Sequence, residues 1–213
     1  MVDLEKASQK AHEFKQREEE VLQAALELFL GLGEDRVTVE MIAEKVGIGK
    51  GTIYKHFATK DEIYLLLMIR YEEEMAQMFQ RIEDTPERKE QLAKEFFLFR
   101  IKDPKRYMLF DRLEQKLVAA RAVPEMLERL HRIRASNAEK LTHIISARIK
   151  EGLLEDVPPY FHVCSAWALA HGAVALMQSQ FYNQVIEDKE GFLDFLLQTG
   201  IRMGNRGQYH KKK

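Results

Sequence analysis

Residues 38–64 read TVEMIAEKVGIGKGTIYKHFATKDEIY, and they contain two short segments of helical character separated by a glycine-rich turn. Thr38 is suited to cap a helix over residues 39–46, and Glu40 places an acid in its first turn, as the helix dipole favours. Gly47 predicts the end of this helix, and the next helix is expected to begin within three or four residues. Two short helices joined by so tight a turn are typical of a helix-turn-helix.

The glycines of this turn also suggest a loop that binds a nucleotide phosphate. A Walker loop requires Ser or Thr after its lysine, but Gly51 follows Lys50, and Glu44 occupies the position of the first glycine. The dinucleotide fingerprint fails as well, because Thr52 stands where its third glycine belongs and a helix precedes it instead of a strand. Both phosphate-loop interpretations are therefore excluded.

Positive charge is concentrated in this turn and in the helix that follows it. Residues 45–60 contain four lysines and neither Asp nor Glu, whereas Glu18, Glu19 and Glu20 lie together in the preceding helix. The whole chain has a formal net charge of −1, so the basic segment is a local feature. Such segregation indicates contact with nucleic-acid phosphates. A solvated helix face is the alternative explanation of lysines at intervals of five residues.

Apolar periodicity predicts helices throughout the chain, and the expected fold class is all-α. Residues 21–32 repeat apolar side chains at helical spacing, and Gly31 and Gly33 are expected to end that helix. All five prolines lie after residue 85, and each precedes a stretch of helical period. Thr85-Pro86 and Asp103-Pro104 are expected to form an N-cap and a first helical residue. No run of residues alternates long enough to predict a strand.

Composition indicates a soluble globular protein, with 46% hydrophobic and 31% charged residues among 213. Cys164 is the single cysteine, so an internal disulfide and a multi-cysteine zinc site are excluded, and we expect a cytoplasmic location. No secretory signal is evident at the start of the chain. The uncharged residues 157–186 are interrupted by polar side chains and prolines, which disfavours a membrane span and favours a helix buried between partners.

The stretch quoted above resembles the DNA-binding domain of the TetR (tetracycline-repressor) family of bacterial transcription regulators. The resemblance covers about residues 16–65 and departs at Gly49, where many members have serine, a change that weakens the N-cap by a few tenths of a kcal/mol, roughly. The matching positions are Thr38, Ile42, Ala43, Gly47, Lys50, Gly51, Thr52, Tyr54, His56, Phe57 and Lys60.

The resemblance implies a division of the chain into domains. Residues 1–15 are expected to be an N-terminal extension and residues 16–65 a three-helix helix-turn-helix domain that binds DNA. A larger C-terminal helical domain over residues 66–205 is expected to bind an effector and dimerise, and residues 206–213 are expected to form a basic tail.

The resemblance also implies roles for individual residues in binding DNA. Thr38 and Thr52 are expected to contact phosphates, as are Tyr54, His56 and Lys60, although His56 could instead be a packed side chain. Gly51 is expected to allow a close approach to the DNA backbone. Lys50 and Lys55 are expected to contact base edges. The full predicted DNA-binding set is Thr38, Gly49, Lys50, Gly51, Thr52, Tyr54, Lys55, His56 and Lys60.

A pair of apolar helices near the C-terminus is the expected dimer interface. Small residues recur along one face of the first helix, where another helix could approach closely. About half a turn away lies a ridge of other apolar residues, which are Val163, Trp167, Ala170, Val174, Met177 and Phe181. Four such helices would meet around a twofold axis, unless both faces are buried within one monomer. The predicted interface residues are Ser165, Ala168, Gly172, Ala175, Ser179, Phe192 and Leu196.

The effector site is expected among aromatic residues and isolated polar groups of the larger domain. Polar groups set in apolar walls can orient a small ligand, although each could equally be ordinary core packing. The predicted residues are Phe97, Phe110, Asn137, Trp167 and His171, with Trp167 expected to face inward.

The sequence therefore predicts a ligand-responsive transcriptional regulator and no enzyme. We expect a homodimeric repressor that binds a palindromic double-stranded operator, with two recognition helices about 34–36 Å apart, and that a small hydrophobic effector releases. No cofactor, metal or membrane partner is expected. The alternatives are a helical-bundle enzyme, such as a carboxylate di-iron protein, or an adaptor that does not bind DNA. A di-iron site requires two Glu-x-x-His motifs, and Glu128-x-x-His131 is the single one in the chain.

Overall fold

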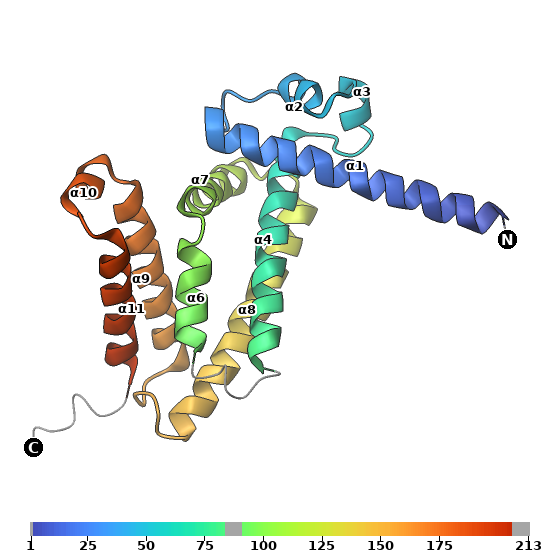
Figure 1. Ribbon diagram of the computed structural model, residues 1–213. Coiled ribbons are helices and arrows are strands. Elements are labelled where there is room, and N and C mark those ends of the chain that lie inside the picture. The colour runs from blue at the N-terminus through green and yellow to red at the C-terminus, as the bar shows by residue number, and fades with distance from the viewer. Residues whose placement is uncertain (1, 84–90, 206–213) are drawn as a thin grey trace, which may run out of the picture. The chain divides into compact units, whose positions relative to one another are not determined.

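The computed structural model of the chain describes residues 2–83 and 91–205. Every regular element within these ranges is an α-helix (Figure 1), and an isolated bridge between Leu154 and Asn205 is the only β pairing that they contain. The predicted all-α class is confirmed. The helices are α1 (Val2–Leu32), α2 (Val39–Val46), α3 (Lys50–Ile53), α4 (Lys60–Glu83), α6 (Leu92–Ile101), α7 (Pro104–Ala120), α8 (Pro124–Lys150), α9 (Pro159–Gln178), α10 (Gln180–Val185) and α11 (Lys189–Gly204).

The described residues form two compact units, and each unit is built from separate parts of the chain. The first unit comprises residues 2–70 and 112–128, and the second comprises 71–83, 91–111 and 129–205. The first unit contains the helix-turn-helix, and the second is the larger helical part. The domain boundaries expected at residues 15 and 65 stay predictions, although α1 is helical from Val2 onward. The expected basic tail, 206–213, lies outside the described residues.

Proline and acidic caps start several of the helices, as the sequence predicts. Pro104 is the first residue of α7, and the backbone N–H of Arg106 donates to Asp103 Oδ1 at 3.0 Å. Pro124 and Pro159 begin α8 and α9 in the same position, where the missing N–H of proline is not needed. The expected cap at Thr85-Pro86 lies outside the described residues.

The core of the first unit joins α1 and the short helices to the beginning of α4. Phe29 of α1 packs against Tyr64 of α4, with 4.7 Å between ring centroids. Gly33 follows α1 with a φ of +88°, which glycine adopts without strain, whereas Gly31 lies inside the helix and does not end it. The other buried apolar side chains of this core include Val21, Leu22, Ala25, Ile42, Ile53, Phe57, Ile63, Leu65 and Met68.

The core of the second unit is built where α6, α9 and α11 pack on one another (Figure 1). Phe97, Ala170, Ala173 and Leu197 form a buried apolar cluster between these helices. Gly200 of α11 lies so close to α9 that a Cβ atom there would be 2.6 Å from the side chain of Leu169. Small residues therefore already serve helix packing within one chain.

A glycine in the left-handed region ends α2, and it provides a test of the turn. Gly47 has a φ of +75° and donates its N–H to backbone carbonyls of α2. We expect Gly47→Ala to lower the free energy of unfolding by about 1 kcal/mol, because an L side chain is disfavoured there. Gly51→Ala is the matched control: Gly51 lies in helical α3, with no atom within 4 Å of a Cβ added there. Urea unfolding that shows equal stability for both variants would contradict this account of the turn.

Candidate nucleic-acid interface

The turn of the helix-turn-helix is held by backbone geometry and by one side-chain cap. Thr38 caps α2, because its Oγ1 accepts a hydrogen bond from the N–H of Met41 at 3.3 Å. Gly49 occupies the N-cap of α3 in an extended conformation and contributes no side-chain hydrogen bond. Since serine could supply that bond, the departure from the family pattern at Gly49 leaves the amide end of α3 uncapped by a side chain.

The predicted DNA-binding residues run from Thr38, the N-cap of α2, through α3 and the residues that follow it, to Lys60, the first residue of α4. Most of them are exposed and available to a partner. The exposed members are Thr38, Gly49, Lys50, Gly51, Tyr54 and Lys55, and the half-buried members are Thr52, His56 and Lys60. Six of the nine residues are thus exposed along one segment of the chain, and their contact with DNA stays a prediction.

Lys50 is paired with a carboxylate of the preceding helix. Its ammonium group forms an ion pair and hydrogen bond with Glu40, and it also lies over the ring of Tyr54, 5.6 Å from the centroid. The hydrogen bond from Lys50 lowers the pKa of Glu40 to about 2. Both side chains are exposed, and exposed ion pairs contribute little to stability. Lys50 can therefore exchange Glu40 for another acceptor.

Lys60 has a structural role that sequence reasoning did not predict. Its ammonium group donates to the backbone oxygens of Glu34 and Val37, at 3.0 and 2.9 Å. These bonds tie the first residue of α4 to the loop between α1 and α2, and burial lowers the pKa of Lys60 below its ordinary value. Two of its three donors already have acceptors in the protein. A phosphate contact by Lys60 stays a prediction, and such a contact would have to use the remaining donor.

Glu34 extends this connection to α7. Its backbone oxygen also accepts a hydrogen bond from the hydroxyl of Tyr64 at 2.9 Å, and its carboxylate receives two hydrogen bonds from Arg112, at 3.2 and 3.3 Å. The neighbouring Asp35 pairs with Lys116 at 2.6 Å. Sequence reasoning missed this cluster, because its members are far apart along the chain and have no local pattern.

His56 is held against the N-terminal part of α1. Its ring stacks on Phe14, with 3.9 Å between centroids and 29° between planes. Its Nδ1 atom is buried and has no hydrogen-bond partner in the described part of the chain. Burial lowers the pKa of His56 below its ordinary value of about 6.5, so the ring is uncharged at neutral pH. Any phosphate contact would use a neutral N–H group.

The predicted effector residues do not converge on one site. Phe97 belongs to the buried cluster of the second unit, Phe110 packs on the ring of Tyr71, and Asn137 donates to the backbone oxygen of Glu72. Only Trp167 and His171 are neighbours, with stacked rings 4.9 Å apart. The expectation that Trp167 faces inward is wrong, because its side chain is 44% exposed at the surface of α9. Effector binding by these five residues stays a prediction.

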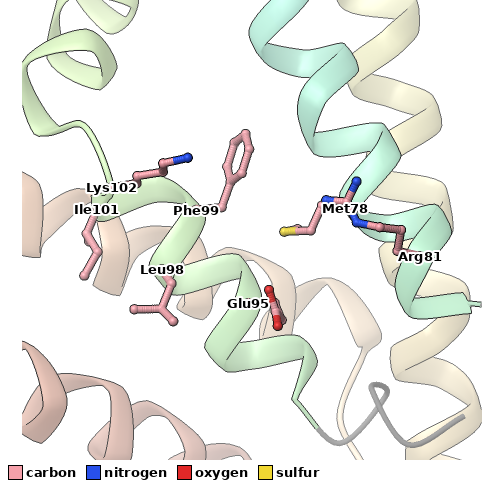
Figure 2. A pocket seen from close by; sticks show the side chains of 7 residues that line it. All are labelled: Met78, Arg81, Glu95, Leu98, Phe99, Ile101 and Lys102. Atoms are coloured by element: carbon pink, nitrogen blue, oxygen red, sulfur yellow. The ribbon is translucent and has the colours of Figure 1, made fainter. Parts of the chain in front are cut away.

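A cavity of about 490 Å³ lies elsewhere in the second unit, between α4 and α6 (Figure 2). None of the five predicted effector residues lines it. Its walls mix apolar side chains with two cations and one acid, and Figure 2 shows Met78 and Phe99 extending into the space between the two helices. The lining residues are Met78, Arg81, Glu95, Leu98, Phe99, Ile101 and Lys102.

The predicted interface residues lie on the surface of α9 and α11. Ser165 and Ala168 are exposed, and the other five are half-buried. Leu196 also packs against the buried cluster of its own chain, so part of its surface is already used. No atom lies within 4 Å of a Cβ added at Gly172, which leaves the space over this glycine open.

A capped short helix, a tight glycine turn and a second short helix, followed by a larger helical part, define the class of helix-turn-helix proteins. Residues 21–67 match the family model of bacterial regulatory proteins, tetR family. The HTH-type transcriptional regulator TcmR of Streptomyces glaucescens is 45% identical over 47 residues, which are 22% of this chain and only 21% of TcmR.

Solved structures show the same fold over most of the chain. A tetR-family regulatory protein from Rhodococcus RHA1 has a TM-score of 0.70 at 17% identity, over 89% of this chain and 97% of the other. FadR from Bacillus subtilis, in complex with stearoyl-CoA, has a TM-score of 0.61 at 18% identity, over 86% and 97%. The match to the TetR family of bacterial regulators therefore covers residues 21–67, and the solved structures extend the likeness in fold to most of the chain.

The hydrogen bonds of Lys60 provide a test of its structural role. We expect Lys60→Met to lower the free energy of unfolding by about 1–2 kcal/mol, because two part-buried carbonyl groups lose a charged donor. Lys55→Met is the matched control, since Lys55 is exposed and a surface substitution changes stability by about 0.5 kcal/mol or less. Chemical unfolding of both variants checks this. Equal stability would show that the Lys60 ammonium group does not hold the loop.

Proposed function

We propose that the protein is a ligand-responsive transcriptional regulator that binds a near-palindromic operator as a homodimer, and that a small effector releases it from DNA. The observation that carries this proposal is the exposed basic turn of the helix-turn-helix, which lies within the segment that matches the family. We infer that the protein represses transcription, because an effector that releases a repressor from its operator turns on expression of the regulated gene.

The exposed face of α3 and its flanks supplies the groups that DNA recognition requires. Lys55 is exposed and forms no ion pair with any residue that the structure describes, so its charge is available to a phosphate or a base edge. Open space over Gly51 allows the helix to approach the DNA backbone. The amide end of α2, capped by Thr38, offers N–H groups that suit a phosphate.

A homodimer is supported by apolar surface on the helices that follow residue 158. By length and composition α9 could cross a membrane, yet only 17% of its apolar window is buried in the single chain. Exposed apolar surface of this extent indicates a partner, and we infer a second copy of the chain, joined through α9 and α11. The exposed large side chains on these helices and on α10 are Tyr160, Phe161, Trp167, Phe181, Tyr182, Val185, Phe195 and Met203.

A small-molecule effector is supported by the cavity between α4 and α6. Its volume lies within the range of sites that bind small ligands, and the related FadR structure contains stearoyl-CoA. Helix α4 supplies Met78 and Arg81 to the cavity, and its first residue, Lys60, bonds to the loop before α2. We infer that the effector acts through α4. A complete switch requires about 5.5 kcal/mol of difference in effector binding between the two states.

The basic face is tested by DNA binding of variants that keep the fold. We expect Lys55→Ala to weaken operator binding by about tenfold or more, because one direct contact contributes about 1–3 kcal/mol. Gly51→Ala should weaken binding while leaving stability unchanged or higher. Lys105→Ala, an exposed residue of α7, is the control. The measurement is fluorescence anisotropy across salt concentrations, on an operator chosen by random-sequence selection.

Two results would contradict the proposal. Failure to select any preferred sequence at moderate salt would reject sequence-specific DNA binding and leave the enzyme or adaptor alternatives. Equal affinity of Lys55→Ala, Gly51→Ala and Lys105→Ala for a selected site would place the DNA contact away from this turn.

The dimer is tested at Gly172, where the single chain leaves space. We expect Gly172→Leu to shift the protein from dimer to monomer, because the new side chain would occupy the space into which the partner helix packs. Ala138→Leu, at an exposed position of α8, adds the same bulk elsewhere and should stay dimeric. Analytical ultracentrifugation measures both. A Gly172→Leu protein that sediments as a dimer would exclude this face of α9 from the interface.

A further inference from the structure

A guanidinium group without a carboxylate partner lies among aromatic rings of the second unit. Arg100 of α6 lies over the rings of Tyr71, Phe96 and Tyr107, at 5.6, 5.4 and 5.5 Å from their centroids. Other arginines of this unit are paired: Arg106 binds Glu74 at 3.0 Å, and Arg134 binds Glu72 at 3.0 Å. Among the residues that the structure describes, no carboxylate pairs with Arg100.

The hydroxyl oxygen of Tyr71 lies beside this guanidinium group, but within the described chain no oxygen accepts a hydrogen bond of normal geometry from its Nε and Nη2 edge. The Nε atom of Arg100 is buried and makes no hydrogen bond, and Nη2 reaches only the sulfur of Met75, at 3.7 Å. A thioether sulfur is a weak acceptor. Rings around the group attract the cation but do not satisfy its N–H donors, and a buried donor left without an acceptor is costly.

Two neighbouring polar atoms, the hydroxyl oxygen of Tyr71 and Nε of Arg106, are likewise buried without a hydrogen-bond partner in the described chain. The hydroxyl of Tyr71 is buried, on a side chain only 7% exposed, and forms no hydrogen bond of normal length and angle within the described chain. The Nε atom of Arg106, whose guanidinium lies over the same Tyr71 ring at 5.0 Å, is likewise buried without a partner. These groups are all donors or can act as donors, so together they suit an anionic acceptor.

The cavity between α4 and α6 is linked to this group of donors by shared neighbours, although Arg100 itself does not line it. Phe99, which Figure 2 shows among the side chains that line the cavity, also contacts the ring of Tyr71, with 5.0 Å between centroids. Met78 lines the cavity one helical turn beyond Met75, whose sulfur faces Arg100. The charged side chains of the lining are Arg81, Lys102 and Glu95, and the two cations outnumber the acid.

We propose that this site binds an amphipathic carboxylate, with its carboxylate group on Arg100 and its hydrocarbon part in the cavity against Phe99, Met78 and Leu98. A planar carboxylate matches the Nε and Nη2 donors of one guanidinium edge, and it supplies the charge that the protein does not. A neutral apolar molecule would fill the cavity and leave that edge unpaired. The proposal rests on the proposed function, in that it names the chemical class of the effector.

The site is tested by calorimetric titration of the full-length protein with decanoate and with 1-decanol, which has the same hydrocarbon length without the charge. We expect decanoate to bind one site per chain and more tightly than decanol. Arg100→Gln should weaken decanoate binding by about tenfold or more while leaving decanol binding unchanged. Arg100→Lys keeps the charge without the fork and should recover only part of the loss. Lys105→Gln, which removes one exposed positive charge from α7, should bind decanoate as the native protein does.

The possible outcomes separate this site from the regulatory function. Far-UV circular dichroism and thermal unfolding first establish that the Arg100 variants are folded. If Arg100→Gln is not folded, Arg100→Lys is used as the test variant in its place. No decanoate binding, equal affinity for decanol, or unchanged affinity in both Arg100 variants would overturn the proposal. Operator binding by the ligand-free protein is measured separately. If the ligand-free protein binds no operator but does bind decanoate, the proposed regulatory function would be rejected and the proposed carboxylate site would stand.

Discussion

The backbone oxygen of Glu34 accepts hydrogen bonds from both Lys60 and Tyr64, and the assembly of the first unit depends on this point. The loop that carries Glu34 leads from α1 into α2, so the start of α4 is tied to the loop that positions the helix-turn-helix. The carboxylate of the same residue binds Arg112 of α7. Glu34 thereby connects the loop after α1 to α4 and to α7, which are distant from one another along the chain.

The locally determined parts of the fold could be predicted from the sequence. Thr38, Gly47 and Asp103 act through atoms a few residues away, and each performs the capping or terminating role that its residue type indicates. The sequence predicts a helix end at Gly31 as well as at Gly33, but of these two only Gly33 has the left-handed conformation. A residue type predicts that a conformation is possible, and the neighbouring residues decide whether it occurs.

The parts that could not be predicted depend on pairs of residues distant along the chain. Glu34 and Arg112 are 78 positions apart, and no pattern in the sequence links them. The inward direction expected for Trp167 assumed that the whole ridge of larger apolar residues faces the core of its own chain. In the structure Ala170 and Val174 of this ridge are buried, whereas Trp167 of the same ridge is left at the surface. Apolar character indicates that a side chain seeks burial, but it does not identify the chain that buries it.

The ion pair between Lys50 and Glu40 has a consequence for how bases would be discriminated. A lysine that already has a carboxylate acceptor gains from a base only the difference between the two acceptors, minus the difference in desolvation. A base edge that offers no acceptor leaves Lys50 with Glu40, at little cost to the complex. If Lys50 contacts a base, Glu40 would compete with that base for the ammonium group, so only a base edge with a well-placed acceptor would gain the contact.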